Sequence, residues 1–194
     1  MIKLGLTGSI GMGKSATAAM FRAEGIPVHD SDAAVHRLYA GKAAPLIEAA
    51  FPGSTKNGIV DRTALAGFVL NNDAAMKKLE AIVHPLVQKT TMDFIGSCEK
   101  SGHRLAVLDV PLLFEVGRDK DCDVVCVVSA DPLVQKERVL ARPGMTEEKF
   151  HAILARQMPD SEKRRRAHFI IDTGRGFEPA RRAVRDVIRT LAGR

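Results

Sequence analysis

The chain has 194 residues, of which 45% are hydrophobic and 27% charged, and this composition is that of an ordinary globular protein. A chain of this length buries enough surface to hold a core without disulfides or a structural metal. No stretch approaches the roughly 18 apolar residues of a membrane span, and the first apolar run is too short for a secretory signal. Together with only three cysteines, these features predict a cytoplasmic protein with no membrane partner.

Positive charge is concentrated in the last third of the chain. Residues 135–194 carry 15 of the 29 Lys and Arg and 8 of the 23 Asp and Glu, a net charge of +7, whereas the remaining residues have a net charge of −1. This asymmetry is typical of proteins that bind nucleic acid, an acidic membrane or a small substrate with several phosphates. Composition does not choose among the three.

The first thirty residues alternate between strand and helix character. Residues 2–7 predict a buried strand, 16–24 a helix and 28–30 a second strand, which together make one right-handed crossover. Later apolar runs predict further buried strands at residues 105–110, 124–128 and 168–172. Helical composition occurs at residues 33–39, 44–50, 62–70, 74–98, 132–141, 146–157 and 178–191. We therefore expect a doubly wound α/β fold with a parallel sheet and a helical insert.

Residues 8–15, GSIGMGKS, match the pattern G-x-x-x-x-G-K-[ST] of a phosphate-binding loop. The loop follows a predicted strand and enters a predicted helix, so its backbone N–H groups converge on a polyphosphate. Lys14 is expected to reach the β and γ phosphates, and Ser15 to hold Mg²⁺. The sequence therefore predicts a nucleoside triphosphate site.

Three classes of protein use such a loop: switch GTPases, motor or transporter ATPases, and small-molecule kinases. A GTPase needs a guanine-reading Asn-Lys-x-Asp segment late in the chain, which the sequence lacks. A transporter ATPase carries a Ser-Gly-Gly signature, which is also missing. These absences favour a kinase.

Two carboxylates follow the second predicted strand. Ligands bind at the carboxyl ends of strands in open parallel sheets, and a carboxylate there can accept the proton of an acceptor hydroxyl. We assign that role to Asp32, with Asp30 orienting water or Mg²⁺. The alternative is that Asp30 or Ser31 caps the helix that includes Ala33.

Residues 105–109 form an apolar strand that ends in a carboxylate, as in a Walker B element, so Asp109 is a candidate metal ligand. The following segment, residues 109–115 (DVPLLFE), joins this strand to an apolar run and an acid. It is suited to lining a groove for a partly apolar substrate, and ordinary packing is the alternative.

At this point the chain resembles the dephospho-CoA kinase family nearly from end to end. The resemblance rests on the order and spacing of several segments: residues 6–15, 30–32, 60–65, 84–86, 109–115, 135–142, 156–158 and 171–174. It implies a P-loop nucleoside-kinase-like three-layer fold. In that fold residues 1–32, 104–135 and 167–194 form the nucleotide-binding core, 33–103 a helical CoA-substrate insert, and 136–166 a small helical lid.

The resemblance also implies roles for individual residues. The catalytic residues would be Lys14, Asp32 and Arg142. ATP would be bound by Gly8, Gly11, Met12, Gly13, Lys14, Ser15, Ala16, Arg138 and Arg142. The acceptor would be bound by Asp32, Arg62, His84, Leu113 and Glu115, and the metal by Ser15 and Asp109. For His84 a purely structural hydrogen-bonding role is an equal alternative, and for residues 163–166 (KRRR) a solvated helix end is as plausible as a phosphate contact.

Arg138 and Arg142 are expected one turn apart on a helix that leads into the lid, so that closure brings both guanidinium groups onto the phosphates. The implied reaction transfers the γ-phosphoryl group of Mg·ATP to the ribose 3′-hydroxyl of dephospho-CoA. The alternatives are another P-loop nucleoside or metabolite kinase and a nucleotide-dependent RNA-binding protein. A single Tyr, no Trp and the absence of an RNA-binding signature disfavour the last, so no nucleic acid partner is expected.

Overall fold

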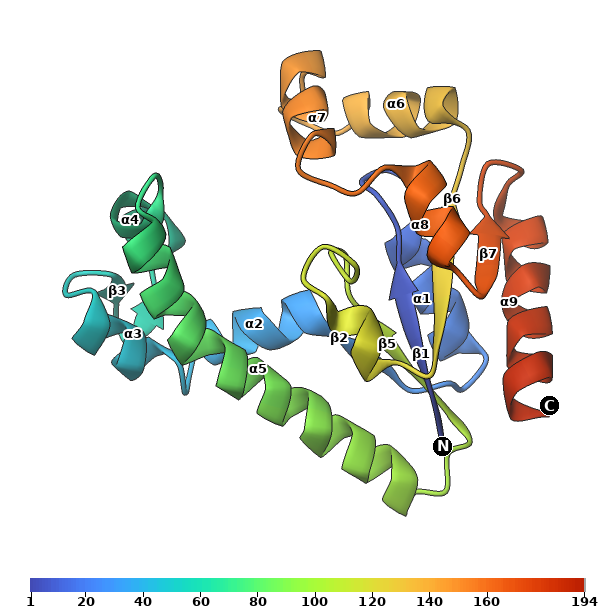
Figure 1. The fold of residues 1–194 in the computed structure, drawn as a ribbon, viewed down its shortest axis with the longest axis horizontal. Helices are drawn as coiled ribbons and strands as arrows, with labels where there is room; N and C mark the ends of the chain where they lie inside the picture. The colour runs from blue at the N-terminus through green and yellow to red at the C-terminus, as the bar shows by residue number, and fades with distance from the viewer. Residues whose placement is uncertain (194) are drawn as a thin grey trace. The chain divides into compact units, whose positions relative to one another are not determined.

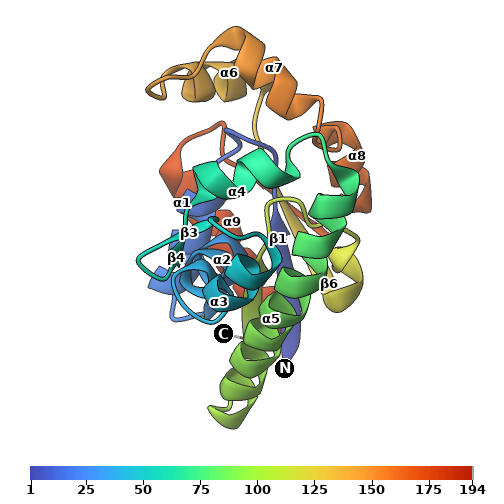
Figure 2. The same cartoon turned by 90° about the vertical axis from the view of Figure 1, so that its left-hand side faces the viewer.

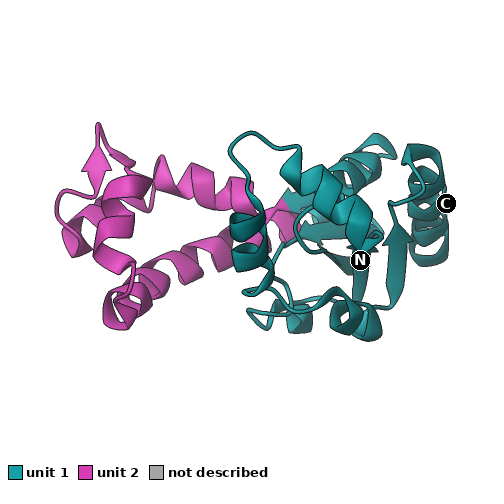
Figure 3. Cartoon of the chain, turned by 90° about the horizontal axis from the view of Figure 1, so that it is seen from above, with its two compact units in different colours: residues 1–29, 98–194 teal, residues 30–97 magenta. Residues whose placement is uncertain are grey.

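The computed structural model describes residues 1–193 and divides the chain into two compact units (Figure 3). Unit 1 combines residues 1–29 with the chain from residue 98 onward, and unit 2 comprises residues 30–97. The functional labels and boundaries that we predicted for the core, insert and lid stay predictions.

Unit 1 is built on a five-stranded parallel sheet with the strand order β2-β5-β1-β6-β7 (Figure 1). The strands of the sheet are β1 (Ile2–Thr7), β2 (Val28–Asp30), β5 (Leu105–Asp109), β6 (Val124–Ser129) and β7 (Phe169–Asp172). The last residue of β2 is the first residue of unit 2. Every residue of β5 is buried, as expected for a strand covered on both faces. The predicted α/β fold with a parallel sheet is confirmed.

The two faces of the sheet are covered by different segments. Leu4 and Leu6 of β1 belong to a core shared with helices α1 (Lys14–Ala23) and α9 (Phe177–Ala192), which lie together on one face (Figures 1 and 2). Gly5 points to the other face, where a Cβ atom on it would lie 2.9 Å from Leu113. The segment after β5 therefore packs on the opposite side of β1.

Three helices connect β6 to β7. They are α6 (Pro132–Leu140), α7 (Glu147–Leu154) and α8 (Asp160–Arg166), and α8 was not predicted as a separate helix. The first two lie near each other at the top of Figure 2, joined by an ion pair of 2.7 Å between Lys136 Nζ and Glu147 Oε1. The Asp131 side chain caps α6 and the Thr146 side chain caps α7, because each accepts a backbone N–H of the first turn.

Unit 2 has its own apolar core. Its helices are α2 (Ser31–Tyr39), α3 (Ala44–Ala50), α4 (Arg62–Val69) and most of α5 (Asp73–Lys100), which contains Pro85. A short hairpin that the sequence analysis missed pairs β3 (Thr55–Lys56) with β4 (Ile59–Val60). Its turn is Asn57-Gly58, with φ of 52° and 74°, a dipeptide that favours two-residue hairpin turns because both residues tolerate positive φ.

Two further observations concern membrane-spanning helices and the state of the cysteines. No helix within residues 1–193 combines the length and the apolar character needed to cross a bilayer. The three cysteines are free, and burial raises the pKa of the Cys126 thiol to about 12. A thiol that stays protonated is a poor nucleophile, which fits its place as core filler.

One charged side chain lies wholly inside unit 1. Lys163 of α8 has no exposed surface, and its Nζ lies 2.7 Å from Oε1 of Glu115, whose side chain is 15% exposed. Glu115 also accepts the backbone N–H of Met158 at 2.8 Å. Burial alone would raise the pKa of Glu115, but these contacts outweigh it and hold the pKa below its usual value. The pair ties α8 to the segment that follows β5.

Replacing Lys163 by Met should lower the free energy of unfolding by about 3 kcal/mol at pH 7, because Glu115 would remain as a buried charge without its partner. The double variant Lys163→Met, Glu115→Gln should recover part of the loss, since no charge is then left behind. Urea unfolding of both variants measures this. A single variant within about 0.5 kcal/mol of the parent protein would contradict a stabilising role for the pair.

The same pair makes stability depend on pH in a defined direction. A carboxyl group with a lowered folded-state pKa stabilises the fold above its unfolded pKa, and this contribution is lost as pH falls through the folded pKa. The parent protein should therefore lose stability below the ordinary glutamate pKa of 4.5. The Glu115→Gln variant should show a smaller loss over that range.

Candidate functional site

The phosphate-binding loop spans residues 8–15, between β1 and α1. A Cβ atom on Gly8 would lie 2.6 Å from the carbonyl oxygen of Val128 in β6, so only glycine fits there. Gly13 has a φ of 91° and precedes the first residue of α1, a conformation that glycine adopts without strain. The predicted strand, loop and helix are thus present, and the loop's N–H groups lie at the start of a helix.

Lys14 and Asp109 form an ion pair at the carboxyl edge of the sheet. Lys14 opens α1 and Asp109 ends β5, and their side chains are 15% and 4% exposed. The structure thereby joins the predicted catalytic lysine to the predicted metal ligand. A positive charge held beside the loop is placed to meet a bound phosphate.

The donor set for a divalent cation is small. The structure contains, within residues 1–193, no group of three or more His, Cys, Asp or Glu that could hold a metal. Ser15, which is exposed in the first turn of α1, and Asp109 offer two oxygen donors. Mg²⁺ suits such a site, because it is usually bound by one or two protein oxygens with phosphates and water completing the shell.

Two glutamines that the sequence analysis left without a role hold the phosphate loop from behind. Gln157 Oε1 accepts the backbone N–H of Ile10 at 3.1 Å, and Gln135 Nε2 donates to the carbonyl of the same residue at 2.7 Å. Gln135 lies in α6 and is 5% exposed. The backbone N–H and C=O groups of Ile10 are therefore both satisfied by side chains, one from the residue just before the predicted lid and one from within it.

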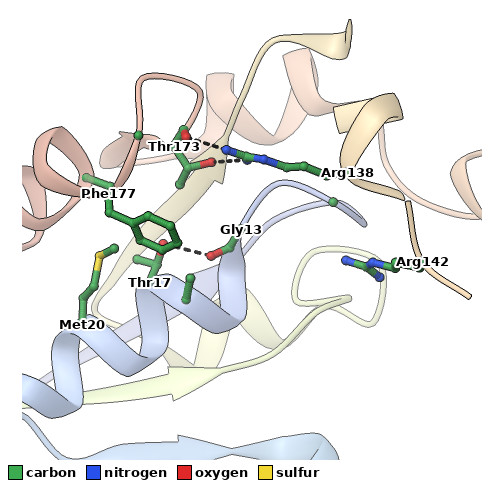
Figure 4. Close-up of a pocket in the computed structure, with 11 residues that line it drawn as sticks. Gly13, Thr17, Met20, Arg138, Arg142, Thr173 and Phe177 are labelled. Carbon is green, nitrogen blue, oxygen red and sulfur yellow. Dashed lines mark hydrogen bonds between the residues drawn. The ribbon is translucent and has the colours of Figure 1, made fainter. Parts of the chain in front are cut away.

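Arg138 and Arg142 line a common pocket but differ in how they are held (Figure 4). Arg138 Nη1 donates to Thr173 Oγ1 at 2.9 Å, and Nη2 donates to the Thr173 carbonyl at 2.7 Å. The Arg142 side chain makes no hydrogen bond or ion pair with the part of the chain that the structure describes.

The expectation that Arg138 and Arg142 share a helix was wrong. Helix α6 ends at Leu140, two residues before Arg142. Pro143 explains this end, because the residue before a proline is disfavoured in the helical conformation.

The pocket beside the loop has a volume of about 230 Å³. Its apolar wall comes from α1 and α9 and includes Ala16, Met20, Phe177 and Ala180. Phe177 is 69% exposed although it is a large aromatic residue, and Figure 4 shows its ring beside the start of α1. The pocket offers apolar contacts for a flat ligand next to the predicted phosphate-binding loop.

Four further acidic and basic candidate residues, Asp30, Asp32, Arg62 and His84, lie in unit 2. Asp30 caps α2 by accepting the N–H of Ala33 at 2.9 Å, as the capping alternative proposed. The carboxylate of Asp32 lies in the first turn of α2 and is exposed. The cap is therefore made by Asp30, which leaves the Asp32 side chain available for another role.

Arg62 lies in a cluster that sequence reasoning did not find. Its Nη1 is 3.3 Å from Nε2 of His36, and its guanidinium lies 5.8 Å from the centre of the Tyr39 ring. His36 and Tyr39 are three residues apart in α2, the spacing that places two side chains on one helix face. Burial raises the pKa of Tyr39, and the nearby Arg62 partly offsets this. His84 is exposed on α5.

Two predicted substrate residues are engaged in the fold. Leu113 has no exposed surface and faces Gly5, and a substrate contact by this residue stays a prediction. Its neighbour Leu112 is 40% exposed. Glu115 is held by Lys163 and Met158, and a substrate contact by Glu115 stays a prediction.

The basic run at residues 163–166 has no single role. Lys163 is buried in its pair with Glu115, whereas Arg165 and Arg166 both reach Glu162 on their own helix. Arg164 is exposed. The alternative of a uniformly solvated helix end is therefore wrong for Lys163.

Comparisons with known proteins agree with this geometry. The sequence model of the dephospho-CoA kinase family matches residues 2–178. A dephospho-CoA kinase of Mesorhizobium japonicum is 60% identical over 193 residues, which covers 100% of this chain and 98% of that protein.

Solved structures show the same fold. A crystal structure of a protein from Thermus thermophilus has a TM-score of 0.86 and 36% identity, covering 98% of this chain and 97% of that chain. A dephospho-CoA kinase from Campylobacter jejuni has a TM-score of 0.68 and 23% identity, covering 97% and 96%. On the family match and the full-length identity, this chain belongs to the dephospho-CoA kinase family.

Proposed function

We propose that this protein transfers the γ-phosphoryl group of ATP to the ribose 3′-hydroxyl of dephospho-CoA. The observation that carries the proposal is the phosphate loop with Lys14 paired to Asp109, in a chain that the family model matches over residues 2–178. The three free cysteines support a cytoplasmic location for this reaction.

ATP would lie along the start of α1. The triphosphate would bind the loop at residues 8–15, and the adenine would enter the neighbouring pocket between Met20 and Phe177. The exposed Phe177 ring supports this placement, since an aromatic face can stack on a base. Arg138 and Arg142, which line the same pocket, would contact the phosphates.

Ser15 and Asp109 would hold Mg²⁺ together with the phosphate oxygens. When bound, the ion would neutralise charge on the β and γ phosphates. Occupation of this site would require Asp109 to share its carboxylate between the cation and Lys14. Lys14 could then turn toward the γ-phosphoryl group, with which it would form a charge-assisted hydrogen bond.

The acceptor hydroxyl would attack phosphorus in line with the departing ADP. A bond forms between O3′ and the γ-phosphorus while the bond from that phosphorus to the β,γ-bridging oxygen breaks, and Asp32 takes the hydroxyl proton. Asp32 follows β2, a strand of the same parallel sheet, and Asp30 already supplies the cap of α2. Arg62, with His36 beside it, would bind an anionic part of the acceptor, and His84 remains a second candidate.

The contacts of α9 do not favour the RNA-binding alternative. Arg185 pairs with Glu24, Arg181 with Glu178 and Arg189 with Asp186. These pairs reduce the positive field that phosphate backbones require.

Measurement of ADP release with dephospho-CoA, with a panel of nucleosides and with RNA tests the assignment. We expect release with dephospho-CoA, and a product whose new phosphate is at the 3′ position by phosphorus NMR. Faster ADP release with a nucleoside or with RNA than with dephospho-CoA would contradict the proposed acceptor.

Replacing Lys14 by Ala should lower turnover about a hundredfold or more, because the lost ammonium group otherwise stabilises charge that moves with the γ-phosphoryl group, at about 3 kcal/mol. Turnover per folded molecule is the measurement. Lys3→Ala is the matched control, since Lys3 lies at the opposite end of β1 and pairs with Asp123. Near-parental turnover of Lys14→Ala would show that this loop is not the catalytic site.

Replacing Asp32 by Asn should leave ATP affinity unchanged and lower turnover by about 10² or more, because the amide cannot accept the proton of the acceptor hydroxyl. Calorimetric titration with ATP and a turnover assay on the same preparation measure both quantities. Lost ATP affinity would move Asp32 to the metal site, and unchanged turnover would leave it without a catalytic role.

A further inference from the structure

Thr173 connects three parts of unit 1 that are far apart in the sequence. It directly follows β7, and its side chain is buried, with 7% of the residue exposed. A Cβ atom on Gly13 would lie 3.0 Å from Thr173 Oγ1 and 3.1 Å from its Cγ2. The threonine side chain therefore lies directly against the turn that ends the phosphate loop.

The two shortest hydrogen bonds of the Thr173 hydroxyl group run in opposite directions. The hydroxyl oxygen lies 2.8 Å from the carbonyl oxygen of Met12 in the phosphate loop and 2.9 Å from Nη1 of Arg138. A carbonyl can only accept and a guanidinium can only donate. The hydroxyl proton therefore points at the Met12 carbonyl, which is nearer than the Ser129 carbonyl at 3.5 Å, and this leaves an oxygen lone pair for Arg138.

A second bond fixes the plane of the guanidinium group. Nη2 of Arg138 donates to the Thr173 carbonyl at 2.7 Å, so the two terminal nitrogens are bound to one residue. Arg142, the other arginine of the pocket, has no comparable partner within residues 1–193. Arg138 is thus held at a set position relative to the phosphate loop, whereas the Arg142 side chain is not.

We propose that Thr173 is a positioning residue that orients Arg138 against the phosphate loop before ATP binds. This inference rests on the proposed function, because it assigns the arginine to the phosphates of ATP. Holding the guanidinium in place removes part of the ordering cost that ATP binding and phosphoryl transfer would otherwise carry. The loop and the arginine then present their donors as one unit.

Replacing Thr173 by Val tests the proposal, because Val keeps the shape and removes the hydroxyl. Loss of a hydrogen bond to a charged group should lower kcat/KM for ATP about tenfold to a hundredfold. The KM for dephospho-CoA should change much less. Thr173→Ser, which keeps the hydroxyl, should stay within about threefold of the parent protein.

The double variant Thr173→Val, Arg138→Ala separates positioning from a general structural role. If Thr173 acts through Arg138, Val at position 173 should have little further effect once the arginine is gone. An equal loss in both backgrounds would overturn the proposal, since Thr173 would then act on the loop alone. Near-parental activity of Thr173→Val would overturn it too. Thr173→Ala replaces Val in the cycle if the Val variant does not fold.

The four proteins of the cycle are the parent, Thr173→Val, Arg138→Ala and the double variant. Their affinity for a non-hydrolysable ATP analogue keeps this test separate from the choice of acceptor. If the parent protein binds the analogue but does not phosphorylate dephospho-CoA, the proposed function fails. A non-additive loss of affinity in the cycle would still support the positioning role of Thr173, and an additive loss would overturn it.

Discussion

The arrangement of the candidate site depends on one ion pair, between Lys14 and Asp109, at the carboxyl edge of the sheet. Lys14 and Asp109 are 15% and 4% exposed, and charges so far removed from water are stable only with a partner. Their pairing requires β1 and β5 to be neighbours, as they are in the sheet. It places an ammonium group at the start of α1, beside the loop where phosphates would bind. The predicted metal ligand and the predicted phosphate contact are thereby joined in one ion pair.

The phosphate loop is held in shape by side chains from outside it. Gln135 and Gln157 bind the two polar groups of Ile10, and the Thr173 hydroxyl binds the carbonyl of Met12. A loop whose carbonyls and spare N–H groups are satisfied from behind keeps its remaining N–H groups directed at a ligand. The loop therefore loses its conformational entropy when the chain folds, and not when a ligand binds or reacts.

The basic side chains of the C-terminal third occupy two kinds of environment, which the net charge of that segment could not distinguish. Arg138 and Arg142 line the pocket beside the loop, whereas Lys163 is buried in a pair with Glu115. The pKa of Glu115 is lowered despite burial because Lys163 and a backbone N–H hold its charged form. The sequence predicted that Glu115, which ends an apolar run, lines a substrate groove. Its main partners in the structure are Lys163 and the backbone N–H of Met158, both inside the fold.

Local spacing was enough to predict the phosphate loop, the buried strands and the family, because glycine positions, helix starts and apolar runs depend on residues close in the chain. Helix ends and caps were partly predictable for the same reason, as Asp30 shows. Only the tertiary structure decided that Leu113 is buried, that Lys163 meets Glu115 and that Gln135, Gln157 and Thr173 brace the loop. Those braces join residues 125 to 161 positions apart, and contacts at such separations leave no periodic pattern in the sequence.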